Sequence, residues 1–198
     1  TLAGEIFAEA ANFPLIIIPL FVLMGNLAGV SGMSRDLYRA ANAWLGHMKG
    51  GLASATVVGC AGFSALSGSS LAAALTMGRV SLPEMQRYNY DDGLATGAIA
   101  AGGTLGILIP PSAGFVIYAI LTEESIGRLF LAGVFPGLML TVLFVIAIWI
   151  VVKRDPSRAP MAAEAVPIGD RMRALAGAGW IIGIVGLTIG GIRSSRAP

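Results

Sequence analysis

The sequence has few charged residues and almost no cysteine or histidine. Only 12% of its 198 residues are charged and 56% are hydrophobic, whereas a soluble domain has about 25% charged residues. The one cysteine, Cys60, excludes an intrachain disulfide and a cysteine-based metal site. The one histidine, His47, excludes a histidine cluster. A net charge of +2, spread between apolar stretches, does not predict nucleic-acid binding. The composition predicts an integral membrane protein.

Apolar stretches divide the chain into candidate membrane segments, because a helix needs about 20 apolar residues to cross a bilayer. The fold class that they predict is an all-α, polytopic membrane protein. In order, the sequence predicts a transmembrane helix over 13–30, an interfacial amphipathic helix over 34–48, a re-entrant hairpin over 51–78, a polar loop over 79–92, a broken transmembrane helix over 94–121, a transmembrane helix over 129–152, a cytoplasmic loop over 153–173 and a last transmembrane helix over 175–192.

Loop charges support a hairpin rather than a single crossing at 51–78. The loop 153–173 has five Lys and Arg residues, so the positive-inside rule places it in the cytoplasm. Counting back through two crossings places the loop 79–92 on the same side. A single crossing at 51–78 would leave the three basic residues of 31–50 outside, whereas a hairpin keeps them inside. A continuous helix of 28 residues would also measure about 42 Å, which is long for a hydrocarbon core of about 30 Å.

Two interrupted segments carry the candidate chemistry. The first is the hairpin tip, Ser67-Gly68-Ser69-Ser70, in a segment where 17 of 28 residues are Gly, Ala or Ser. At such a tip, helix-end carbonyls and serine hydroxyls are oxygen ligands suited to Na⁺, and helix-start amides suit a carboxylate. The second is Gly102-Gly103-Thr104-Leu105-Gly106, followed by Ile109-Pro110-Pro111-Ser112, where we expect the helix to unwind. Discontinuous helices of this kind build transporter sites near the bilayer midplane.

Other interpretations of these segments fit less well. Gly- and Ser-rich membrane helices are often only packing surfaces, and a purely structural or assembly subunit stays open as an alternative. An intramembrane serine protease needs a base beside its nucleophile, but the single histidine lies in the predicted interfacial helix and no lysine lies in an apolar segment. A phosphate-binding loop is excluded because no GK[ST] follows a glycine run. The sequence therefore does not predict an enzyme.

Taken together, three stretches resemble the large membrane subunit of tripartite ATP-independent periplasmic (TRAP) transporters. They are GFSALSGSSLAAALTMGRVSLPEM, RYNYDDGLATGAIAAGGTLGILIPPS and VIYAILTEESIGRLFLAGVFPGL. The resemblance implies Na⁺-coupled import of an organic acid, such as a C4-dicarboxylate or sialic acid, across the cytoplasmic membrane of a bacterium or archaeon. It implies no cofactor other than Na⁺ as the coupling ion. The implied partners are a small membrane subunit and a periplasmic substrate-binding protein.

The resemblance also implies roles for individual residues. It implies a first inverted repeat of an elevator-type transporter, with Ser67 to Ser70 as the hairpin tip and Gly103, Thr104 and Gly106 as an unwound strand facing it. Together these residues would bind Na⁺. The organic acid would lie near Ser69, Ser70, Pro110, Pro111 and Ser112.

The large subunits of this family are about twice as long as this chain. The second repeat is absent here, so we expect the chain to be an N-terminal-half fragment or a truncated reading frame. The alternative that stays open is a transport-inactive relic.

Overall fold

The computed structural model describes residues 13–160, 167, 169–174, 179 and 183, and these contain helices but no strand. The predicted all-α class is therefore confirmed for this part of the chain. The elements are α2 (Phe13–Val30), α3 (Met33–Leu45), α4 (Gly51–Ser67), α5 (Ser70–Arg87), α6 (Asp92–Leu108), α7 (Ala113–Thr122), α8 (Ile126–Arg154) and the 3₁₀ turn η1 (Pro156–Arg158). The helix predicted over 175–192 lies outside the described residues, apart from Gly179 and Gly183.

Helix α4 is the central element of the bundle. It contacts α2, α3, α5, α6 and α8, and nearly all of its residues are buried. Its neighbours approach closely because its sequence, GLASATVVGCAGFSALS, is dominated by small side chains. Larger apolar side chains fill the remaining space, with Leu52, Phe63 and Leu66 each about 1% exposed or less. A helix this rich in Gly and Ser holds its place through tertiary packing rather than through helix propensity.

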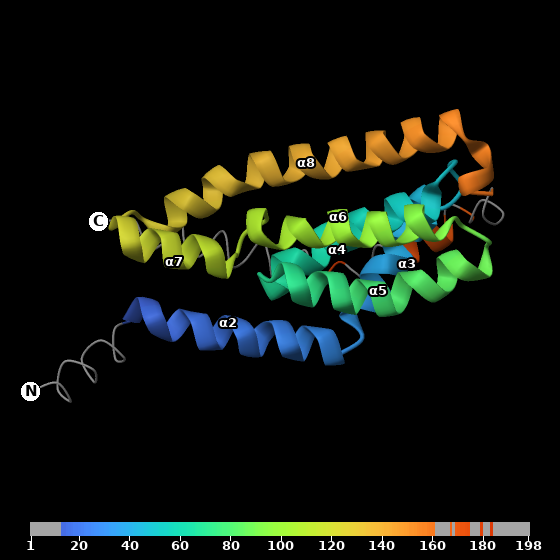
Figure 1. The fold of residues 1–198 in the computed structure, drawn as a ribbon. Coiled ribbons are helices and arrows are strands. Elements are labelled where there is room, and N and C mark those ends of the chain that lie inside the picture. Colours follow the sequence, from blue (N-terminus) through green and yellow to red (C-terminus); the bar gives the residue numbers. More distant parts are fainter. Residues whose placement is uncertain (1–12, 161–166, 168, 175–178, 180–182, 184–198) are drawn as a thin grey trace, which may run out of the picture.

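Helix α8 runs along one side of the bundle and is its longest helix (Figure 1). It lies beside α6 for much of its length and continues beside α7. Much of its apolar surface is exposed, including Leu138, Val142 and Ile146. Within the described residues, Asp92–Thr122 and Ile126–Arg154 are the two helical runs long and apolar enough to cross a membrane. The exposed apolar face of α8 is the kind of surface that lipid covers.

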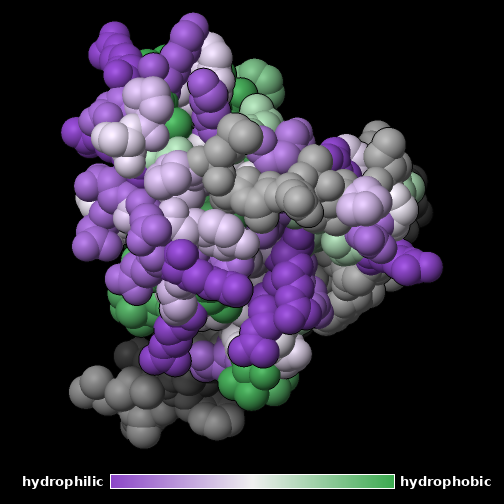
Figure 2. All heavy atoms as spheres, turned by 90° about the vertical axis from the view of Figure 1, so that its right-hand side faces the viewer, coloured by the Kyte–Doolittle hydropathy of each residue, from purple (hydrophilic) through white to green (hydrophobic). Residues whose placement is uncertain are grey.

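One end of the bundle is hydrophilic, in contrast to the apolar face of α8. Figure 2 looks at the end where α5 joins α6 and where α8 terminates, and this face is mainly hydrophilic. Lys153 and Arg154 end α8, and Lys153 Nζ lies 4.8 Å from the Trp149 ring centroid. Aromatic and basic side chains in this arrangement are typical of a membrane–water interface.

Two predicted irregular segments are helical in the structure. The predicted loop over 79–92 is wrong for its first part, because α5 continues to Arg87 with Pro83 inside it. Pro83 has no N–H to donate to the Arg79 carbonyl, and both residues are exposed, so this gap in the helix lies outside the core. The predicted unwinding at Gly102–Gly106 is also wrong, because α6 continues to Leu108. The break follows it, at Ile109–Ser112.

Candidate ion and substrate site

The turn between α4 and α5 is built by a glycine and a serine with different roles. Gly68 ends α4 with φ +57, a left-handed conformation that glycine adopts without steric cost, and its N–H donates to the Ser64 carbonyl at 2.8 Å. Ser69 is extended and caps α5, with its Oγ accepting the Ala72 N–H at 3.4 Å. The Ser67 hydroxyl donates to the Ser69 carbonyl at 3.5 Å. The stretch that weakens a continuous helix therefore ends one helix and starts the next.

The break between α6 and α7 follows from its two prolines. The Ile109 N–H makes the last hydrogen bond of α6, to the Leu105 carbonyl at 2.8 Å. Pro110 and Pro111 have no N–H to continue the ladder, and the peptide between them is cis. Helix α7 then starts at Ala113 after an extended Ser112. Pro110, Pro111 and Ser112 are all buried, so the break lies inside the protein.

The hairpin turn and the helix break lie against each other (Figure 1). The Ala113 N–H donates to the Gly68 carbonyl at 3.4 Å. A Cβ on Gly68 would lie 2.7 Å from the Pro111 carbonyl oxygen, and a Cβ on Gly106 would lie 2.6 Å from the Ser70 nitrogen. On the same side of α6, a Cβ on Gly103 would lie 3.2 Å from the Ser70 carbonyl oxygen. These glycines let two interrupted backbones meet.

Oxygen atoms without hydrogen-bond partners mark this region. Within the described part of the chain, three buried side-chain oxygens have no partner: Ser64 Oγ and Ser112 Oγ here, and the Tyr38 hydroxyl on α3. Ser112 belongs to the break, and Ser64 lies one turn before Gly68. A buried hydroxyl without a partner is costly, so each such group needs an explanation. A ligand coordinated by hydroxyl and carbonyl oxygens would explain these two unpaired serine hydroxyls.

Thr104 differs from the other predicted site residues. Its side chain is exposed, and its hydroxyl donates to the Ala101 carbonyl at 2.7 Å in its own helix. At 100° per residue, Thr104 lies on a different side of α6 from Gly103 and Gly106. The structure therefore brings the other predicted residues together at the tip and the break, but not the Thr104 hydroxyl.

Three glycines that the sequence analysis did not single out support the site. A Cβ on Gly25 of α2 would lie 3.0 Å from Ser67 Cα. On α8, a Cβ on Gly133 would lie 2.8 Å from the Leu108 carbonyl oxygen, and one on Gly137 would lie 2.8 Å from Ile109 Cγ1. The spacing of the α8 pair, small-xxx-small, is a known signal for close helix packing in membranes and is visible in the sequence. No local signal pairs Gly25 with the tip.

The site has no ionisable side chain, since its members are Ser, Gly and Pro. Within the described residues, no group of three or more His, Cys, Asp and Glu side chains lies together. Two titratable groups that the fold perturbs, Tyr90 and Asp155, lie elsewhere, at the hydrophilic end. There, burial raises the pKa of Tyr90, whose hydroxyl oxygen accepts the Leu52 N–H at 3.4 Å. The candidate site therefore offers neutral oxygens and backbone dipoles, not proton transfer.

Comparison with known proteins identifies relatives over the whole chain. Residues 1–198 match the family model described as the DctM component of tripartite ATP-independent periplasmic transporters. The chain is 39% identical, over 98% of its length, to the C4-dicarboxylate TRAP transporter large permease protein DctM of Pseudomonas aeruginosa. It is 36% identical, over 97% of its length, to the ectoine TRAP transporter large permease protein TeaC of Halomonas elongata. It is 36% identical, over 82% of its length, to the sialic acid TRAP transporter large permease protein SiaM of Vibrio cholerae.

These relatives are permeases and not enzymes, as the sequence indicated for this chain. The chain spans less than half of each of them: 45% of the Pseudomonas protein, 44% of the Halomonas protein and 38% of the Vibrio protein.

Proposed function

This chain belongs to the DctM component family of tripartite ATP-independent periplasmic transporters, and from that membership we propose that it forms part of a large permease subunit importing an organic acid with Na⁺. The observation that carries the proposal is the contact between the hairpin tip at Gly68–Ser70 and the helix break at Pro110–Ser112. The proposed location is the cytoplasmic membrane. The proposed partners are a small membrane subunit and a periplasmic binding protein that delivers the substrate.

We infer that α4 and α5 form a re-entrant hairpin rather than two crossings. Helix α8 meets the break at Gly133 and Gly137. At 1.5 Å per residue, Gly137 lies about 17 Å from the first residue of α8 and about 24 Å from Lys153. If α8 spans the bilayer, the break and the hairpin tip beside it are at middle depth. Non-helical backbone at that depth is tolerated where protein surrounds it, and here Ser67 and Gly68 are buried while Ser69 and Ser70 are half-buried.

Na⁺ binding at the tip is supported by the type and arrangement of the oxygen atoms. The last carbonyls of α4, the hydroxyls of Ser67 and Ser69 and the buried Ser112 Oγ are all neutral oxygen ligands. Carbonyls at the C-terminal end of a half-helix also carry the negative end of the helix dipole, which favours a cation. Gly103 and Gly106 contribute by allowing the tip to approach α6, and not by unwinding.

A carboxylate is the proposed group by which the substrate is recognised. Helices α5 and α7 begin at Ser70 and Ala113, and both N-termini lie beside the contact between tip and break. Backbone N–H groups at a helix start favour an anion. The relatives are named for C4-dicarboxylates, sialic acid and ectoine, all of which carry a carboxylate. An elevator-like movement of the hairpin and the broken helix together would carry the ion and the substrate across.

The test uses the complete transporter encoded by the reading frame that contains this chain. It would be reconstituted in liposomes with its binding protein, and uptake of labelled succinate, sialic acid and ectoine would be measured. We expect an inward Na⁺ gradient to drive uptake of one of them. Ser67→Ala combined with Ser69→Gly should raise the Na⁺ concentration for half-maximal uptake about tenfold or more, because two oxygen ligands are lost.

The variants separate ion binding from folding. Glycine at an N-cap costs only a few tenths of a kcal/mol relative to serine, so Ser69→Gly removes the hydroxyl with little loss of capping. Ser69→Thr keeps both the hydroxyl and the cap and should retain the original Na⁺ dependence. Uptake that does not depend on Na⁺, or an unchanged Na⁺ dependence in the double variant, would contradict the proposed ion site. Absence of uptake under all conditions would favour a structural subunit or an inactive relic.

A further inference from the structure

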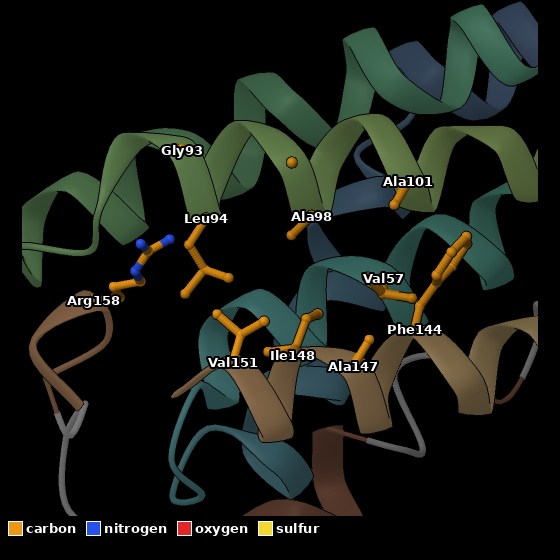
Figure 3. A pocket seen from close by; sticks show the side chains of 11 residues that line it. Val57, Gly93, Leu94, Ala98, Ala101, Phe144, Ala147, Ile148, Val151 and Arg158 are labelled. Atoms are coloured by element: carbon orange, nitrogen blue, oxygen red, sulfur yellow. The ribbon is translucent and has the colours of Figure 1, made fainter. Parts of the chain in front are cut away.

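A groove away from the candidate site lies between α6 and α8. Its volume is about 270 Å³, and Val57 of α4 forms its floor (Figure 3). Apart from Leu94, the α6 wall is made of small residues, among them Gly97 and Ala101, and a Cβ on Gly97 would meet no atom within 4 Å. The α8 wall is apolar and runs from Phe144 to Val151. The groove opens outward, since Gly97 and Val151 are exposed as well as lining it.

The position of the groove favours a lipid as its occupant. Phe144 to Val151 are the last two turns of α8 before Lys153, so the groove covers about 10 Å of depth next to the hydrophilic end. Trp149 and Lys153 mark that end as the membrane–water boundary. An apolar cavity of this size does not retain water well, because water there finds no polar partners. In a bilayer, the apolar molecule available at this depth is an acyl chain.

One cation closes the groove at the hydrophilic end. The Arg158 guanidinium is directed toward Leu94 and Gly93 at the mouth (Figure 3). Its Nε donates to Asp155 Oδ2 at 3.0 Å, and within the described residues its two terminal nitrogens have no partner. Hydrogen bonds from Ser157 and Arg158 hold the pKa of Asp155 below its usual range, so Asp155 stays ionised and orients the guanidinium. A planar guanidinium with two open N–H edges suits a phosphate.

A carboxylate lies beside the same mouth. The Asp91 N–H donates to the Arg158 carbonyl at 2.8 Å, and Asp91 Oδ1 is 3.1 Å from where a Cβ on Gly93 would lie. This negative charge disfavours a headgroup that carries only negative charge. It favours one in which an ammonium accompanies the phosphate. With Asp155 and Asp91 beside Arg158, the mouth presents two carboxylates and one guanidinium, so both charged groups of a zwitterionic headgroup find a partner of opposite sign.

We propose that the groove between α6 and α8 binds one phosphatidylethanolamine molecule, with an acyl chain along Gly97 and Ala101, its phosphate at Arg158 and its ammonium at Asp91. The lipid links the start of α6 to the end of α8 at the hydrophilic end of the bundle. This site is separate from the tip and the break, so the test of lipid binding is independent of the test of the proposed transport function.

The test is native mass spectrometry of the purified complete transporter after delipidation, with phosphatidylethanolamine or phosphatidylglycerol added back. We expect one phosphatidylethanolamine to rebind with preference over phosphatidylglycerol. Gly97→Leu should weaken its binding at least tenfold by filling the groove, and Arg158→Gln should weaken it about tenfold by removing a charged hydrogen-bond donor. Arg158→Gln keeps the backbone carbonyl that accepts the Asp91 N–H, so the local fold is retained.

Matched variants control for bulk and charge. Ala100→Leu adds a similar side chain at an exposed α6 position outside the groove, and Arg154→Gln removes an exposed charge from the end of α8. Both should bind lipid like the original protein. Equal binding by Gly97→Leu and Ala100→Leu would overturn the acyl-chain site, and a preference for phosphatidylglycerol would overturn the role of Asp91. A photoreactive residue at Ala147 that crosslinks to polypeptide instead of lipid would show that protein covers the groove.

Discussion

At the scale of single residues, Gly106 is the position where the backbone of the tip lies closest to the broken helix. A Cβ there would lie 2.6 Å from both the Ser69 carbonyl carbon and the Ser70 nitrogen, which are backbone atoms that no rotamer change can move. Gly106→Ala should therefore destabilise the protein by about 1–3 kcal/mol, as overpacking does. We also expect it to abolish uptake by displacing the tip. The thermal unfolding midpoint in detergent and the uptake rate measure the two effects.

Gly78→Ala is the matched control for that variant. Gly78 lies inside α5, and the nearest atom to its added Cβ would be Ile99 Cγ2 at 3.5 Å, an ordinary contact. Because glycine within a helix costs roughly 0.5–1 kcal/mol relative to alanine, this variant should be slightly more stable than the original protein. Equal stability of Gly106→Ala and Gly78→Ala would show that the tip is not packed against α6 as described.

At the scale of elements, two glycine turns with the same backbone conformation test how tightly α8 packs on the rest. Gly32 precedes α3 with φ +83, and Gly50 precedes α4 with φ +73. A Cβ on Gly32 would meet nothing within 4 Å, whereas one on Gly50 would lie 3.0 Å from Cγ2 of both Ile148 and Val152. Gly32→Ala should cost about 1–2 kcal/mol for the left-handed backbone alone. Gly50→Ala should cost about 1–3 kcal/mol more, by overpacking α8.

Denaturant or thermal unfolding of the two variants, compared with the original protein, measures that difference. If both substitutions cost the same, α8 does not pack against the start of α4, and the buried side chains of Ile148 and Val152 would need another explanation. The comparison is independent of transport, since neither turn touches the tip or the break.

The elements also show which features the sequence could predict. The SGSS turn was visible because glycine and serine have special roles at helix ends, and the Ile109–Ser112 break because proline cannot continue a helix. The prediction that the glycines of GGTLG form an unwound strand is wrong. Gly102, Gly103 and Gly106 instead remain helical and let α4 and α5 approach, at Cys60, Ala74 and Ser70. A sequence does not distinguish a glycine needed for its backbone conformation from one needed for lack of a side chain.

The contacts between distant parts of the chain in the site could not be predicted from the sequence, for a related reason. Gly25 lies 42 positions before Ser67, and nothing local to either residue shows that α2 passes the tip. Ser64 resembles any other serine in a packed helix until its burial and its lack of a partner are seen. The chemistry of the tip was predictable because it is encoded by neighbouring residues. Its surroundings were not, because they depend on which helices meet.

At the scale of the whole molecule, three hydrophilic segments of the described chain lie at one end. The turn after α3, the connection from α5 to α6 and the end of α8 all lie there, while the connection from α7 to α8 lies at the opposite end (Figure 1). This arrangement is what a hairpin that enters and leaves from one side would produce. A single crossing by the same segment would place its two ends on opposite sides. The side of the membrane on which each segment lies is therefore a direct test.

Single cysteines, introduced one at a time with Cys60→Ala, provide that test in intact cells. We expect Lys49→Cys, Gln86→Cys and Ser157→Cys to react with an impermeant maleimide only after the membrane is opened. Lys49 follows α3, Gln86 is near the end of α5 and Ser157 follows α8, and these three segments lie at the hydrophilic end (Figure 1). Glu124→Cys, at the opposite end, should react in intact cells. All four positions are exposed, so reactivity reports sidedness and not burial. Labelling of Lys49→Cys from outside, with Gln86→Cys protected, would mean that the segment between them crosses the membrane once and would exclude the re-entrant hairpin.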